Sequence, residues 1–245
     1  EFDTKKAQKK LKAYVESSQQ TIDTKADVML EHFIPQVVNK KKLRGRAKGL
    51  VVTQNIETAI RYHKAINRIL AAQGNPFKAL VAFSGTKEVD GVEYTEAGIN
   101  GFSENDTKEM FDKNYTGNKK PAGVNEDECR LLVVANKYLT GFDQPKLSAM
   151  YVDKKLAGVI CVQALSRLNR SAPKLGKKTE DVFVLDFFNT ADDIKIAFDP
   201  FYTATSLSEA TDINVLHELK DAMDDIDVYE WYEVEDFVTR YFNNE

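Results

Sequence analysis

Short runs of β-branched and other apolar residues recur along the middle of the chain, and stretches with helical periodicity separate them. Each run is short enough for a strand buried on both faces. The runs lie at residues 49–53, 79–83, 131–135, 149–152 and 182–185. The clearest helical stretches lie at 56–70 and 156–170. Strands that alternate with helices predict a parallel α/β sheet flanked by helices, with functional loops at the carboxyl ends of the strands.

We divide the chain into three parts on these patterns. Residues 1–47 are predicted as a helical segment and basic connector, and residues 48–190 as the sheet domain. Residues 191–245 are predicted as an acidic helical extension, the start of a C-terminal helical region. Residues 84–102 contain four glycines and are expected to form a loop.

Charge and cysteine content narrow the functional class. The 245 residues carry a formal net charge of −4, so any contact with nucleic acid is expected to be local. Cys129 and Cys161 lie in apolar surroundings and are expected to be buried free thiols, as in a reducing compartment. No apolar run has the length of a membrane span and no signal peptide is visible, which favours the cytoplasm. Because the chain begins at Glu1 and not at Met, we expect a fragment.

Two arginines and a glutamine recur at helical spacing near the end of the second clear helix. Gln163, Arg167 and Arg170 stand at i, i+4 and i+7, which is one helix face. Neighbouring guanidinium groups repel each other unless an anion lies between them, and their planar forks suit a triphosphate. The alternative is that both arginines pair with acidic residues on neighbouring elements.

A glycine turn follows the third strand. Gly141 permits a backbone turn that other residues disfavour, and Asp143 can accept hydrogen bonds from a ribose hydroxyl or a nearby arginine. The alternative is an ordinary turn with a capping aspartate. Because residues 136–143, Thr53–Gln54 and Ser84–Gly85 all follow strands, we expect them to share one rim of the sheet.

Small hydroxyl side chains and free backbone N–H groups at strand ends can bind phosphates. Thr53 and Gln54 follow the first strand, and Ser84 and Gly85 follow the second. Simple helix capping by Asn55 is the alternative for the first of these sites. The chain contains no G-x-x-x-x-G-K-[ST] phosphate loop, and its three histidines are too scattered to predict a zinc site.

Taken in order, these segments resemble the second RecA-like lobe of superfamily 2 helicases and translocases. Residues 131–147 are similar to that family's fifth motif and residues 163–170 to its sixth, the arginine-finger motif. Residues 49–66 resemble the fourth motif, and residues 79–86 the segment after it. The wording T-G-F-D-x-P followed by Q-A-x-x-R-x-N-R is most similar to the motor (R) subunit of type I restriction endonucleases.

The resemblance implies a RecA-like fold of the P-loop NTPase type and a nucleotide site shared between two lobes. ATP and Mg²⁺ would be bound mainly by a first lobe that this chain lacks. Arg167 and Arg170 would reach the γ-phosphate, with Gln163 beside them. Gly141 and Asp143 would couple the nucleotide to DNA and contact the ribose. The fragment alone is expected to be inactive.

The resemblance also implies partners. Double-stranded DNA would be gripped along its backbone without base reading, by Thr53, Gln54, Ser84, Gly85 and Thr140. A nuclease domain would belong to the same polypeptide, and methyltransferase and specificity subunits would assemble with it. Two alternatives remain open at this point: a lobe of another superfamily 2 helicase or remodeller, and a catalytically silent RecA-like binding module.

Two positions depart from the superfamily pattern. Ser166 stands where glycine is common in the sixth motif, and its bulk is expected to alter the approach to the γ-phosphate. Asn136 stands where aspartate is common in the fifth motif, so a salt bridge expected at this position is in doubt.

Overall fold

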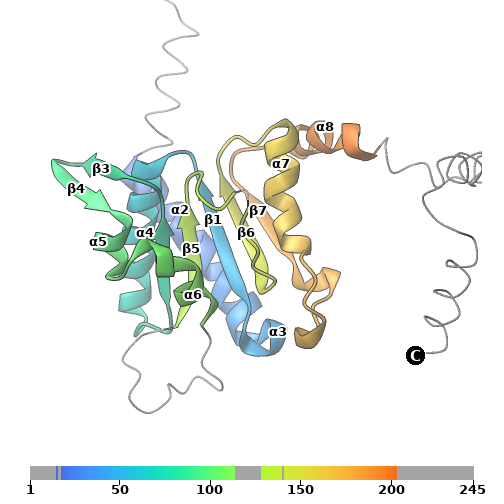
Figure 1. Ribbon diagram of the computed structural model, residues 1–245, viewed down its shortest axis with the longest axis horizontal. Helices are drawn as coiled ribbons and strands as arrows, with labels where there is room; N and C mark the ends of the chain where they lie inside the picture. The colour runs from blue at the N-terminus through green and yellow to red at the C-terminus, as the bar shows by residue number, and fades with distance from the viewer. Residues whose placement is uncertain (1–14, 16–17, 114–127, 140, 203–245) are drawn as a thin grey trace, which may run out of the picture. The chain divides into compact units, whose positions relative to one another are not determined.

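The computed structural model describes residues 15, 18–113, 128–139 and 141–202. Its centre is a five-stranded parallel sheet in the order β2-β5-β1-β6-β7 (Figure 1). The predicted parallel α/β sheet is therefore confirmed. The strands are β1 Lys48–Thr53, β2 Lys78–Ala82, β5 Cys129–Val134, β6 Leu147–Asp153 and β7 Phe183–Asp186.

Helices precede, separate and follow these strands. The α-helices are α2 Gln19–Phe33, α3 Lys42–Gly45, α4 Ile56–Ala72, α5 Glu96–Asn100, α6 Thr107–Asp112, α7 Gly158–Leu165 and α8 Ala191–Tyr202. A π-helical turn, Ile34–Asn39, follows α2. Short 3₁₀ turns lie at Glu104–Asp106, Ser166–Asn169, Pro173–Leu175 and Thr179–Asp181. Asn55 caps α4 by accepting a hydrogen bond from the backbone of Thr58, 2.9 Å away.

Each face of the sheet has its own hydrophobic core, because side chains alternate along every strand. Val51 faces α2 and α4, whereas its neighbours Leu50 and Val52 face the opposite core, to which α6, α7 and α8 contribute. Both faces are covered, which explains why the strands contain continuous apolar runs. Cys129 and Cys161 are buried in the second core and form no disulfide, as predicted.

A glycine lets α2 approach the sheet closely. A Cβ atom at Gly49 would lie 2.6 Å from Leu131 Cδ2 and 2.9 Å from the ring of Phe33, the last residue of α2. The described part of residues 1–47 thus packs into the core of the sheet domain. Contacts divide the chain into two units after Phe198, and the structure describes only Asp199 to Tyr202 of the second.

The prediction of an irregular loop at residues 84–102 is wrong. The chain there forms the antiparallel hairpin β3 Thr86–Val89 and β4 Val92–Thr95, followed by α5. Asp90 and Gly91 make the turn with φ of 53° and 77°. An Asp-Gly pair at positive φ is a strong hairpin signal, because such a turn matches the twist of paired strands. The four glycines obscured that signal.

A buried lysine at the start of β1 gives the fold a testable pH dependence. The Lys48 side chain is fully buried, and its ammonium group donates to the carbonyl oxygens of Lys113 and Cys129 at 2.8 and 2.7 Å. Burial lowers the pKa of Lys48 to about 8 from its ordinary 10.5, although Glu128 opposes the shift. Between these pH values the unfolded chain binds more protons, so the free energy of unfolding rises with pH.

Replacing Lys48 by methionine should remove this rise. We expect the wild-type free energy of unfolding, minus that of K48M, to increase by about 3 kcal/mol from pH 8 to above pH 10.5. Urea unfolding across this range measures it, and titration of other groups cancels in the difference. Parallel curves for the two proteins would show that Lys48 keeps its ordinary pKa in the fold.

Candidate functional site

The loop after β5 runs from one end of the sheet to the other. We call residues 135–146 the crossing loop. At its first end, Lys154, just beyond β6, donates to the Ala135 carbonyl oxygen at 3.1 Å and to the Asn136 side chain. At its other end, the Lys146 carbonyl accepts a 2.8 Å hydrogen bond from the Lys48 backbone, where β1 begins. The prediction that residues 136–143 share one rim with Thr53–Gln54 is therefore wrong, since only the first part of this loop stays at the carboxyl ends.

Buried side chains hold the crossing loop against the sheet. Leu139 and Phe142 belong to the second core, and the ring of Tyr138 stacks on Phe142 with centroids 4.8 Å apart. Buried Gln144 donates to Asp112 Oδ1 at 3.0 Å. Gly141 lies between these anchors with φ of 68°, a left-handed conformation that favours glycine. Asp143 projects outward, with 73 % of its side chain exposed.

Arg167 holds the crossing loop from its buried side with two hydrogen bonds. Its Nε donates to the carbonyl oxygen of Leu139 at 2.9 Å, and its Nη1 to that of Phe142 at 2.6 Å. The residue is only 8 % exposed. Burial lowers the pKa of Arg167, the charge of Arg170 adds to this, and Asp143 opposes it. The predicted alternative of a structural arginine thus describes Arg167 in part, although its partners are carbonyl oxygens and not carboxylates.

Arg170 has the opposite character. Its side chain is 55 % exposed, and its Nε lies 3.6 Å from Asp143 Oδ1. Ion pairs this exposed contribute little to stability, so the guanidinium can exchange its partner at low cost. A cavity of about 300 Å³ opens beside it, and its lining includes Asn169, Lys177, Lys178 and Thr179.

The helix that carries these arginines ends earlier than predicted. α7 stops at Leu165, a 3₁₀ turn follows, and the backbone of Arg170 is no longer helical, with ψ of 126°. The Ser166 hydroxyl donates to the carbonyl oxygen of Val162 at 2.5 Å, a back-bond that bends helices. Since a 3₁₀ turn has three residues per turn, Arg170 leaves the face that carries Gln163. The expectation of one shared helix face is wrong, whereas the contact between Arg170 and the crossing loop remains. Gln163 is exposed on α7.

Of the four residues predicted to contact DNA at the ends of β1 and β2, one is buried and three are exposed. Thr53 is fully buried, and its hydroxyl donates to the carbonyl oxygens of Val134 and Asn55 at 3.1 and 3.2 Å. That hydroxyl ties two strand ends together and does not face a ligand. Gln54, Ser84 and Gly85 are exposed. Thr140 lies outside the described residues.

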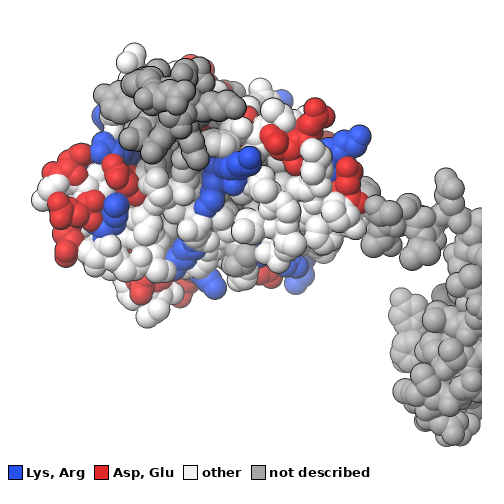
Figure 2. All heavy atoms as spheres, turned by 90° about the horizontal axis from the view of Figure 1, so that it is seen from above, with Lys and Arg blue, Asp and Glu red and all other residues white. Residues whose placement is uncertain are grey.

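The carboxyl ends of the strands lie uppermost in Figure 1, and Figure 2 views the molecule from that side. Lysine and arginine side chains lie across the middle of this face, and acidic side chains gather at the left margin and again toward the upper right (Figure 2). The hairpin β3–β4, with Glu88, Asp90 and Glu93, projects on that same side. This face therefore carries charges of both signs, with basic side chains toward its middle.

Sequence patterns missed two lysines that hold the crossing loop. Lys154 donates to Asn136, so asparagine at this position keeps a polar partner without a salt bridge. Lys137 pairs with buried Glu96 at 2.9 Å. Neither pair has a local sequence signature, because the partners lie 18 and 41 residues apart.

A family model described as type I restriction enzyme subunit R domain 3 matches residues 45–184. The chain belongs to this family. The match covers β1 to β6 and the first two residues of β7, and it includes the crossing loop, Arg167 and Arg170. It confirms the resemblance to the type I restriction subunit drawn from the fifth and sixth motifs.

Individual relatives agree with the family match. The chain is 29 % identical over 186 residues to the type I restriction enzyme SauMRSORF196P endonuclease subunit of Staphylococcus aureus strain MRSA252, covering 66 % of this chain and 20 % of the relative. It is 27 % identical over 129 residues to the type I restriction enzyme HindI endonuclease subunit of Haemophilus influenzae, covering 50 % of this chain and 12 % of the relative. The chain thus spans a fifth or less of these relatives.

One solved structure with a similar arrangement is the C-terminal domain of the DEAD-box protein Dbp5. The similarity has a TM-score of 0.39 and 14 % sequence identity, and covers 72 % of this chain and 78 % of that one. In the described part of the chain, no helix is long and apolar enough to span a membrane.

Proposed function

We propose that this domain is the second motor lobe of an ATP-dependent translocase of double-stranded DNA, acting within the restriction subunit of a type I enzyme. The observation that carries the proposal is the contact of both arginines with one loop. Arg167 braces the crossing loop from inside, and Arg170 pairs with Asp143 on its surface. The crossing loop extends from the strand ends to this arginine pair, so it can connect two ligand sites.

The proposed nucleotide site lies at the far end of the crossing loop. ATP and Mg²⁺ would be held mainly by a first lobe of the complete subunit, and the bound nucleotide supplies the phosphoanhydride bond that is hydrolysed. Arg170 is exposed and only weakly paired, so its guanidinium group is free to turn toward a γ-phosphate. Arg167 holds the crossing loop in position for this contact, and Asp143 lies next to Arg170. Gln163 stays in the proposal as an exposed polar side chain on α7.

The proposed DNA site lies at the strand ends. Gln54, Ser84 and Gly85 are exposed there and can contact the phosphate backbone without reading bases. Thr140 stays in the proposal as a residue of the crossing loop. Thr53 supports the site through its buried hydrogen bond to Val134. Closure and opening of two lobes around ATP would then move the DNA. Methyltransferase and specificity subunits, a nuclease domain in the same polypeptide and a cytoplasmic location complete the proposal.

The direct test uses a complete restriction subunit assembled with its partner subunits. We expect double-stranded DNA to stimulate ATP hydrolysis. We also expect a third strand bound along the duplex to be displaced after a delay that grows with its distance from the loading site. Separation of the duplex strands would indicate a helicase lobe instead. Absence of ATP hydrolysis at every DNA concentration would favour a catalytically silent module.

A further inference from the structure

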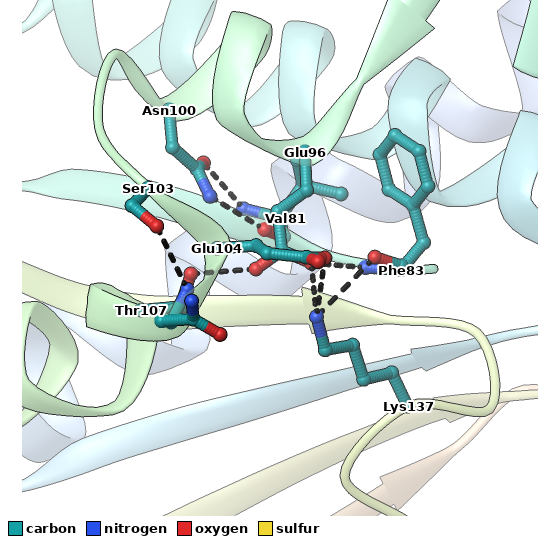
Figure 3. Close-up of polar contacts among 9 residues, drawn as sticks. Val81, Phe83, Glu96, Asn100, Ser103, Glu104, Thr107 and Lys137 are labelled. Atoms are coloured by element: carbon teal, nitrogen blue, oxygen red, sulfur yellow. Dashed lines mark hydrogen bonds and ion pairs between the residues drawn. The ribbon is translucent and has the colours of Figure 1, made fainter. Parts of the chain in front are cut away.

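A buried carboxylate joins the two loops that border the proposed DNA site. Glu96 is the first residue of α5 and is 2 % exposed. Its Oε2 accepts from the backbone N–H of Phe83 at 2.7 Å, and its Oε1 from the hydroxyl of Thr107 at 2.5 Å. The ammonium group of Lys137 lies 2.9 Å from the same Oε2 (Figure 3). One side chain therefore connects the end of β2, α6 and the crossing loop.

The contact with Phe83 fixes the end of an edge strand. Among the described strands β2 pairs only with β5, so its other side presents backbone groups that need partners. The Asn100 side chain bonds both the N–H and the carbonyl oxygen of Val81, at 3.1 and 2.8 Å. Glu96 takes the next outward N–H, at Phe83 (Figure 3). Phe83 directly precedes exposed Ser84 and Gly85.

The contact with Lys137 fixes the beginning of the crossing loop. Lys137 also lies 3.2 Å from Glu104, whose side chain is 53 % exposed. Burial lowers the pKa of Lys137, but hydrogen bonds with the two carboxylates outweigh this and raise it above its usual value. The preceding residue, Asn136, is held from the opposite side by Lys154. The loop is thus anchored on both sides where it leaves β5.

We propose that Glu96 is a positioning residue for DNA binding, because it sets the loop after β2 and the start of the crossing loop at one fixed separation. The inference rests on the proposed function. DNA contacts at both loops must match one phosphate backbone, so their separation controls affinity for DNA. The nucleotide end of the crossing loop has its own anchors in Arg167 and Gln144, and it does not depend on Glu96.

The test is Glu96→Gln in a complete restriction subunit with its partner subunits. The amide preserves shape but removes the charge that holds Lys137. We expect the DNA concentration for half-maximal ATP hydrolysis to rise about tenfold. The KM for ATP and the maximal rate should stay within twofold of wild type. The matched control is Glu104→Gln, which changes an exposed partner of the same lysine and should leave all three quantities within twofold.

A second variant separates positioning from general damage. Lys137→Met leaves the bonds from Glu96 to Phe83 and Thr107, and should reproduce the raised DNA requirement. The double variant should be no worse than either single variant, whereas multiplied effects would mean that Lys137 acts on DNA independently and would overturn the inference. If E96Q does not assemble, K137M alone decides.

Other outcomes are equally decisive. An unchanged DNA requirement in E96Q overturns the inference, and so does a KM for ATP that rises in parallel, since that is the result of a merely structural role. If the wild-type subunit responds to DNA and E96Q matches it, only the positioning role fails. If the wild type shows no ATP hydrolysis with DNA, the proposed function itself fails.

Discussion

Replacing Arg170 by alanine in a complete restriction subunit is expected to slow DNA-dependent ATP hydrolysis by about 10³-fold, the lower end of what an arginine that reaches a γ-phosphate contributes. The expectation follows from exposure. More than half of the Arg170 side chain is open to solvent, and its partner Asp143 is more exposed still. A pair of this kind is free to release the guanidinium to a phosphate, because little stability is lost when it opens.

The same substitution should leave the fold intact. We expect the free energy of unfolding of R170A to lie within about 0.5 kcal/mol of wild type, as for most exposed substitutions. Lys174→Ala is the matched control, because Lys174 is an exposed cation in the neighbouring 3₁₀ turn Pro173–Leu175. Its hydrolysis rate should be unchanged. Full activity of R170A would exclude the finger role and favour a silent module.

Arg167→Ala is expected to lower the free energy of unfolding of this chain by about 3 kcal/mol. Removing the guanidinium leaves the carbonyl oxygens of Leu139 and Phe142 without their donors, and each buried unsatisfied group costs roughly 1–3 kcal/mol. The loss of packing by the buried stem adds to this. Urea unfolding of the 245-residue chain measures the change.

Arg167→Lys refines the test. A lysine ammonium group is a compact donor and lacks the planar fork that spans two carbonyl groups, so it should recover less than half of the lost stability. ATP hydrolysis should fall in both variants together with stability, in contrast to R170A, where activity falls alone. If R167A were as stable as wild type, the two hydrogen bonds of Arg167 to the crossing loop would not contribute to the stability of the fold.

The strands were predictable because their physical signal is local. The run at residues 131–135 is apolar at every position, and a strand covered by helices on both faces requires this. The N-cap at Asn55 was equally readable, since one side chain and one nearby backbone N–H suffice. Arg170 and Asp143 could be paired as candidates because their motifs have a recognisable order.

What could not be predicted depends on contacts between distant residues. A fully buried strand gives no sign of which way its last side chain points, so the sequence predicts a DNA contact for Thr53 although its hydroxyl bonds Val134. The end of α7 depends on one hydroxyl of Ser166 bonding backward. In the sequence, Glu96 resembles any acidic residue in the first turn of a helix. Its pairing with Lys137 depends on the fold, which brings the crossing loop next to α5.

The most direct measurement is a structure of a complete restriction subunit bound to DNA and a non-hydrolysable ATP analogue. In that structure Arg170 should leave Asp143 and place its guanidinium about 3 Å from the γ-phosphate oxygens. Arg167 should keep its bonds to the crossing loop. An Arg170 that still faces Asp143, with the terminal phosphate out of its reach, would contradict the shared nucleotide site.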